Sequence, residues 1–110
     1  MAILRSHHIA VSTPDLKRLV DFYTQVLGAP QAGRLGDNIA FIDIGGTRLE
    51  LIEDKNATSG QPAGCKGLIH VAFEVDDVQR TYEDLKAKGI VFDTPAKEAR
   101  PGLWVAFFKD

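Results

Sequence analysis

Cysteine is nearly absent from this 110-residue chain, which contains Cys65 alone. A single cysteine cannot form an internal disulfide, so disulfide-stapled scaffolds are excluded and a cytoplasmic location is expected. The chain also lacks any apolar run close to the roughly 20 residues that a membrane span needs. Its first residues have no signal-peptide core, so we expect no membrane partner.

An excess of charge of either sign is absent as well. Lys and Arg together number 13 against 15 Asp and Glu, which gives a net charge of −2, and the basic residues are scattered. This balance gives no electrostatic reason to expect nucleic acid as a partner. The 45% hydrophobic and 25% charged content is ordinary for a globular protein of one domain.

What the chain does contain is an internal repeat, in which His8 aligns with His70 at an offset of 62 residues. Two copies of a unit that cannot bury its apolar face alone are expected to pack against each other. The matching segments are residues 8–11 (HIAV) with 70–73 (HVAF), residues 15–16 (DL) with 77–78 (DV), and Arg18 with Arg80.

The first copy predicts the element order β-α-β-β-β. Thr13 is the expected helix N-cap, Gly28 the expected left-handed stop, and Gly45-Gly46 the expected hairpin turn. The expected strands are residues 6–12, 30–36, 38–44 and 47–53.

The second copy predicts β-α-β-β. Its helix is expected to begin at Asp76 or Asp77 and to end at Gly89. The expected strands are residues 67–75, 90–93 and 103–108, with a turn over residues 94–102. We therefore predict an α+β protein with a first module over residues 1–54, a connector over 55–66 and a second module over 67–110, whose last strand is missing.

Three strands of this scheme each carry one metal-capable side chain on their more polar face, namely His8, Glu50 and His70. Two imidazoles and a carboxylate suit a divalent Ni, Zn, Co, Mn or Fe ion and leave coordination positions open for substrate. A slip of one residue would exchange His8 for His7. The alternative is three half-exposed polar residues without a metal.

Three more residues are candidates for substrate binding. Arg48 shares the face of Glu50 by alternation and suits an anionic group, although a solvated rim charge is an equal alternative. Trp104 on the last predicted strand could form a wall of the substrate pocket. The alternative is that its side chain is simply buried in the core or in an interface. Arg100 lies in the predicted turn before Trp104 and is a candidate for a mobile residue that gates access to the site. The alternative is an ordinary charge on a surface loop.

These residues resemble the vicinal oxygen chelate superfamily, which contains glyoxalase I, methylmalonyl-CoA epimerase, extradiol dioxygenases and bleomycin resistance proteins. The resemblance covers essentially the whole chain. It is carried by residues 8–11, 15–16, 21–28, 48–52, 70–78 and 101–110.

The resemblance implies two βαβββ modules that form a curved, incomplete mixed barrel around a divalent metal. It implies His8, Glu50 and His70 as metal ligands, a small substrate with vicinal oxygens, and glutathione as a candidate co-substrate. The family's fourth ligand, a Glu on a final strand, would fall beyond Asp110. Glu50 is therefore the family-matched carboxylate that remains for proton transfer.

Because only some members of this superfamily use a carboxylate at the position of Glu50, the resemblance implies a glyoxalase-like lyase or isomerase that works through an enediolate. A non-catalytic small-molecule binding or resistance protein and an extradiol-type dioxygenase stay open as alternatives. The unpaired sheet edge left by the missing strand predicts a homodimer.

Overall fold

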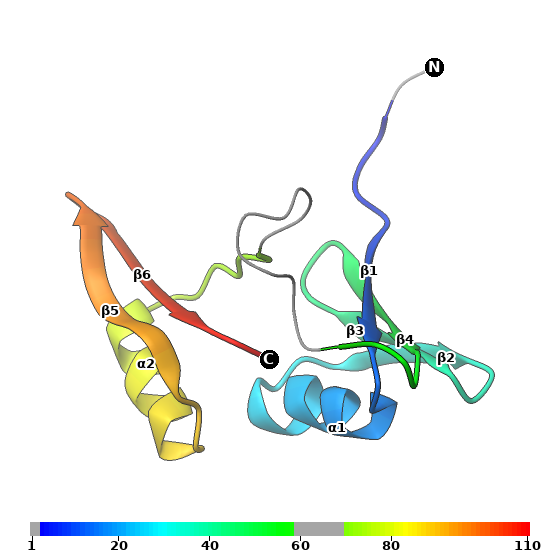
Figure 1. Cartoon of the computed structure of the whole chain (residues 1–110). Helices are drawn as coiled ribbons and strands as arrows, with labels where there is room; N and C mark the ends of the chain where they lie inside the picture. Colours follow the sequence, from blue (N-terminus) through cyan, green and yellow to red (C-terminus); the bar gives the residue numbers. More distant parts are fainter. Residues whose placement is uncertain (1–2, 59–69) are drawn as a thin grey trace. The chain divides into compact units, whose positions relative to one another are not determined.

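The computed structural model describes residues 3–58 and 70–110. The chain divides into two compact units, Met1–Val71 and Ala72–Asp110 (Figure 1). No helix in the described part of the chain is long and apolar enough to cross a membrane.

The first unit contains one four-stranded sheet whose elements follow the predicted order. Strand β1 pairs in parallel with β4, while β4 pairs with β3 and β3 with β2 in antiparallel fashion, so the order is β1-β4-β3-β2. The elements are β1 (His8–Thr13), α1 (Leu16–Asp21), the π-helix η1 (Phe22–Val26), β2 (Gln31–Leu35), β3 (Ile39–Asp43) and β4 (Arg48–Glu53).

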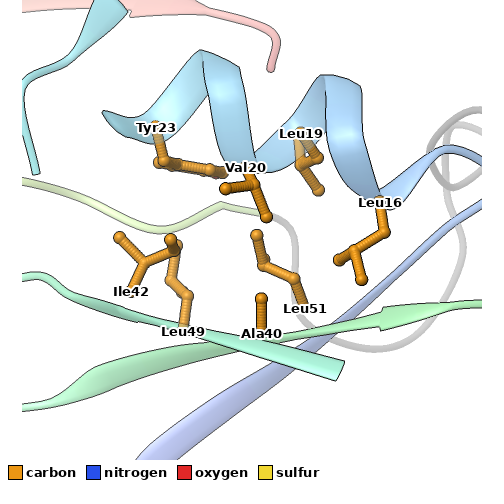
Figure 2. Close-up of a cluster of buried hydrophobic side chains, with 8 residues drawn as sticks. All are labelled: Leu16, Leu19, Val20, Tyr23, Ala40, Ile42, Leu49 and Leu51. Carbon is orange, nitrogen blue, oxygen red and sulfur yellow. The ribbon is translucent and has the colours of Figure 1, made fainter. Parts of the chain in front are cut away.

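The core of this unit lies between α1, η1 and one face of the sheet. Figure 2 shows the helical side chains pointing toward those of β3 and β4. Ile42, Leu49 and Leu51 are the largest fully buried side chains. The buried cluster consists of Leu16, Leu19, Val20, Tyr23, Ala40, Ile42, Leu49 and Leu51.

The predicted start of the first helix is wrong by two residues. Asp15, not Thr13, is the N-cap, because its carboxylate accepts the Arg18 N–H at 3.1 Å. Thr13 is buried, and its hydroxyl accepts the Asp15 N–H at 3.2 Å. Thr13 therefore ends β1 and orients the cap residue. The predicted stop is confirmed, since Gly28 has φ +76°.

The second unit contains α2 (Val78–Ala87), β5 (Phe92–Arg100) and β6 (Leu103–Phe108), with β5 and β6 forming an antiparallel pair. Asp77 caps α2 by accepting the Arg80 N–H, again at 3.1 Å. Asp77 and Arg80 are the repeat partners of Asp15 and Arg18. The internal repeat is therefore visible in the structure as the same helix start built twice.

One strand prediction and one turn prediction in the second half are wrong. Residues 70–75, the described part of the predicted strand 67–75, form no strand, because a periodic pattern supplies no ladder partner. Residues 67–69 lie outside the described residues. The predicted turn 94–102 is mostly strand, because β5 runs to Arg100 and turns at Pro101-Gly102. Pro95 is tolerated because the register shifts between Thr94 and Lys97.

Candidate functional site

The pairing of β1 with β4 places His8 and Glu50 on one face of the sheet. His8 lies opposite Arg48 and Ala10 opposite Glu50, so His8 and Glu50 are diagonal neighbours on parallel strands. A strand spacing of about 4.8 Å and a rise of about 3.3 Å per residue put their Cα atoms about 8 Å apart. Both side chains project from the face opposite the buried Leu49 and Leu51.

His8 is exposed and its ring is held by its neighbour. The Nδ1 atoms of His7 and His8 lie 2.9 Å apart in a hydrogen bond. The two rings meet edge to face, with centroids 5.2 Å apart and an interplanar angle of 79°. The Nε2 atom of His8 is the ring nitrogen that this bond does not use.

Glu50 is half-buried in the middle of the sheet, between Ala10 of β1 and Phe41 of β3. Arg48, two residues earlier on the same face, is exposed and lies between His8 and Asp43 in the register. An imidazole, a carboxylate and a guanidinium thus share one open face of the sheet. This set can bind a cation and an anionic oxygen side by side.

His70 belongs to the first unit and is exposed. The next residue, Val71, packs against the buried cluster of that unit. Within residues 3–58 and 70–110, no three His, Cys, Asp or Glu side chains lie close enough together to hold a metal ion. The structure thus brings His8 and Glu50 to one face, and His70 does not join them in such a group.

Arg100 and Trp104 lie in the second unit, on the β5-β6 hairpin. Arg100 is exposed and pairs with Leu103 in the register, while Trp104 pairs with Glu98 and is 36% exposed. The Oε2 atom of Glu98 accepts the Gly102 N–H at 3.4 Å, which fixes the turn between the two strands. Both candidate residues therefore sit at the turn end of the hairpin.

One acidic residue of β4 that the sequence analysis missed has a structural role. The Oε2 atom of Glu53 accepts the Leu16 N–H at 2.9 Å and lies 3.4 Å from Lys55 Nζ. The Leu16 N–H, followed by Lys55, lowers the pKa of the Glu53 carboxyl. By alternation Glu53 shares the face of Leu49 and Leu51, so a carboxylate on the core face was the signal for this contact.

Comparison with known proteins finds related sequences and a related fold. The chain is 33% identical to the mitochondrial methylmalonyl-CoA epimerase of Mus musculus over 78% of its length, and it spans only 54% of that protein. It is 30% identical to a protein of Vibrio cholerae named probable lactoylglutathione lyase, over 94% of this chain and 80% of the other.

The fold also matches a solved structure. A superfamily member from Sphaerobacter thermophilus superposes with a TM-score of 0.78 at 18% identity, over 98% of this chain and 90% of the other. This likeness confirms the predicted mixed α+β, glyoxalase-like fold. The model of the Glyoxalase/Bleomycin resistance protein/Dioxygenase superfamily matches residues 5–110, and the chain belongs to that superfamily.

Proposed function

We propose that this protein is a metal-dependent, glyoxalase-like lyase or isomerase that moves a proton on a carbon beside a carbonyl group. The observation that carries the proposal is the shared open face of His8 and Glu50, in a chain of this superfamily. Members of the superfamily typically bind divalent metal ions, and an imidazole with a carboxylate suits such an ion.

The proposed ligands are His8, Glu50 and His70, and the proposed ion is Ni, Zn, Co, Mn or Fe in the divalent state. A bound ion would supply Lewis acidity toward two neighbouring substrate oxygens. Proton transfer falls to a carboxylate, which would take the proton from the carbon next to the carbonyl and return it to the neighbouring carbon. Glu50 is the proposed carboxylate, and it is half-buried between Ala10 and Phe41 in the register.

Substrate anchoring is assigned to three residues. Arg48 lies on the face of Glu50 and suits a carboxylate or another anionic substrate group. Arg100 and Trp104 are proposed to supply a second charge and a flat apolar wall from the β5-β6 hairpin.

Two substrate classes follow from the names of the relatives. The epimerase relatives favour an acyl thioester of coenzyme A, and the lyase relative favours a glutathione hemithioacetal with glutathione as co-substrate. Both reactions begin with removal of a carbon-bound proton beside a carbonyl. We further propose that the protein acts in the cytoplasm as a homodimer.

The test combines metal analysis with proton exchange. The purified chain is expected to hold stoichiometric divalent metal and to exchange the α-proton of methylmalonyl-CoA, or of a glutathione hemithioacetal, with deuterium in D₂O, followed by NMR. Glu50→Gln should abolish the exchange. A metal-free protein that binds either compound without exchange would contradict the enzyme and identify a binding protein instead.

The role of His70 has its own test. His70→Ala is expected to lose the bound metal, because removing one of three ligands opens the site to water. The fold should persist, since His70 is exposed and lies outside the buried cluster. Metal content and circular dichroism are measured together on the variant. Full metal content in His70→Ala would remove His70 from the ligand set.

A further inference from the structure

The open face of the four-stranded sheet in the first unit carries a row of apolar side chains at one end. The ladders place Leu35 opposite Ile39 and Ile39 opposite Ile52, so these three residues form the apolar row across β2, β3 and β4. Phe41 lies two residues after Ile39 on β3 and shares its face. Ile39, Phe41 and Ile52 are half-buried, yet none is among the described side chains that pack against the buried cluster.

Apolar residues are unexpected on this face. A sheet that packs against helices on one face commonly has polar side chains on the other, because that face is open to water. Leu35, at the end of the apolar row, is nevertheless 63% exposed. Adjacent apolar side chains on an open surface are typical of places where a ligand or a partner binds. The apolar row is therefore suited to hold the apolar part of a ligand.

The opposite end of the same face is charged. Arg48 lies opposite Asp43 in the register of β4 against β3. The Oδ1 atom of Asp43 accepts the Gly45 N–H at 2.8 Å, which ties this carboxylate to the turn between the strands. Arg48 is exposed, and within the described residues no hydrogen bond or ion pair holds its guanidinium. It is therefore available to an anionic group, and a guanidinium matches the two oxygens of a carboxylate.

We propose that the open face binds a molecule with a carboxylate at one end and an alkyl chain at the other, with the carboxylate at Arg48 and the chain over Phe41 and the apolar row. Arg48 and Ile52 are four residues apart on β4, which is about 13 Å at about 3.3 Å per residue. An extended chain of about ten carbons spans this distance.

This ligand would pass the proposed reaction site. Glu50 lies between Arg48 and Ile52 on β4 and opposite Phe41 of β3, so a carbon near the carboxylate end would lie beside it. The inference names the class of substrate and rests on the proposed function where the reaction is concerned. Binding itself requires only the charged end and the apolar row, and it needs no metal.

An NMR titration with decanoate tests where such a ligand binds. The full chain, labelled with ¹⁵N, is titrated with sodium decanoate and separately with sodium butyrate. Amide shifts should concentrate on β2, β3 and β4, and decanoate should bind at least about 10-fold more tightly, because its longer chain buries more apolar surface. Equal affinities for the two acids, or shifts confined to the exposed apolar side chains of β6, would overturn the inference.

Matched variants test the charged end. Arg48→Gln should weaken decanoate binding about 10-fold, because it removes charge-assisted hydrogen bonds. Arg34→Gln removes an exposed arginine from the other face of the sheet and should leave the affinity unchanged. Asp43→Asn keeps an acceptor for the Gly45 N–H but removes a repelling charge, so decanoate should bind more tightly. Equal affinities in Arg48→Gln and Arg34→Gln would overturn the assignment of the carboxylate to Arg48.

A variant at the apolar row tests the other end. Leu35→Gln should weaken decanoate binding and leave butyrate binding unchanged, because only the longer chain reaches the row. The fold should persist, since Leu35 is 63% exposed. Unchanged decanoate affinity in Leu35→Gln would overturn the placement of the chain.

Failure of this inference differs from failure of the proposed function. A chain that holds no metal and exchanges no α-proton, yet binds decanoate on the open face, would overturn the proposed enzyme and leave the binding site. A chain that exchanges the α-proton of methylmalonyl-CoA but binds decanoate no better than butyrate would overturn the inference and leave the enzyme.

Discussion

Glu50 and Glu53 lie three residues apart on β4, yet alternation sends them to opposite faces of the sheet. Glu50 faces the open side with His8, while Glu53 reaches the first backbone N–H of α1. The same residue type thus has a proposed chemical role on one face and an observed structural role on the other. The strand period, which can be read from the sequence, makes this division.

The role of Glu53 predicts a pH dependence of stability. Its pKa is lowered in the folded state, chiefly by the Leu16 N–H, so its contribution is complete above the unfolded pKa of about 4.3 and is lost as pH falls through the folded pKa. Glu53→Gln should therefore melt below the wild type at pH 7, and the difference should shrink as pH falls below 4. Thermal melts across this range test it.

The matched control for Glu53 is Glu83→Gln, which removes an exposed carboxylate from α2. That variant should melt with the wild type at every pH. A gap between Glu53→Gln and the wild type that stays constant from pH 7 to pH 3 would contradict the proposed contact with α1.

A substitution at Leu51 tests how much the buried core contributes to stability. This side chain is fully buried under α1, so Leu51→Ala should lower the free energy of unfolding by about 2–5 kcal/mol, through lost burial and the cavity left behind. Leu35 on the edge strand β2 is 63% exposed, and Leu35→Ala should change the same quantity by less than about 0.5 kcal/mol. Urea denaturation compares the two, and equal losses would contradict the observed packing.

At the scale of the element, the duplicated helix start gives a third prediction. Asp15→Ala removes the side chain that accepts the Arg18 N–H and should destabilise the first unit by about 1 kcal/mol. Asp15→Asn keeps an acceptor oxygen and should lose only a small part of that free energy. Urea denaturation measures the free energy of unfolding of both variants. An Asp15→Ala variant as stable as the wild type would contradict Asp15 as the N-cap and favour Thr13 instead.

The elements of the first unit could be predicted because local signals and pairing agree there. Alternation over β1, β3 and β4 matches their ladders, and the turn at Gly45-Gly46 has the positive φ that glycine allows. In the second half, residues 70–75 carry a strand pattern without a ladder. The length of β5 also depends on register shifts around Pro95, which the local sequence pattern does not predict. Strand pairing over long sequence separations is the information that local patterns lack.

The candidate site likewise has a part that local sequence patterns predict and a part that they do not. Alternation placed His8 and Glu50 on one face, and the register confirms this placement. The bond between His7 and His8 depends on two side-chain rotamers, which sequence periodicity does not specify. The assignment of His70 as a third ligand stays a prediction, because it came from the repeat and from family resemblance rather than from a ladder.

At the scale of the whole molecule, the two units differ in how completely they bury their apolar side chains. The first has a continuous buried cluster, whereas residues 72–110 contain no residue that is fully buried. Three apolar side chains of β6, namely Leu103, Trp104 and Phe107, are each 36–44% exposed. One helix and a two-stranded sheet bury too little surface for independent stability, so these residues need a covering surface.

This imbalance, together with the edge strands that have no second neighbour among the described residues, is the basis for the proposed homodimer. Light scattering after size exclusion should give twice the chain mass of 12.0 kDa. Leu103→Glu should shift the protein toward monomer, because burying its carboxylate in an apolar interface is costly. Lys97→Glu, which changes charge on the paired strand β5, should leave the mass unchanged. A monomeric wild type at high concentration would contradict the proposed homodimer.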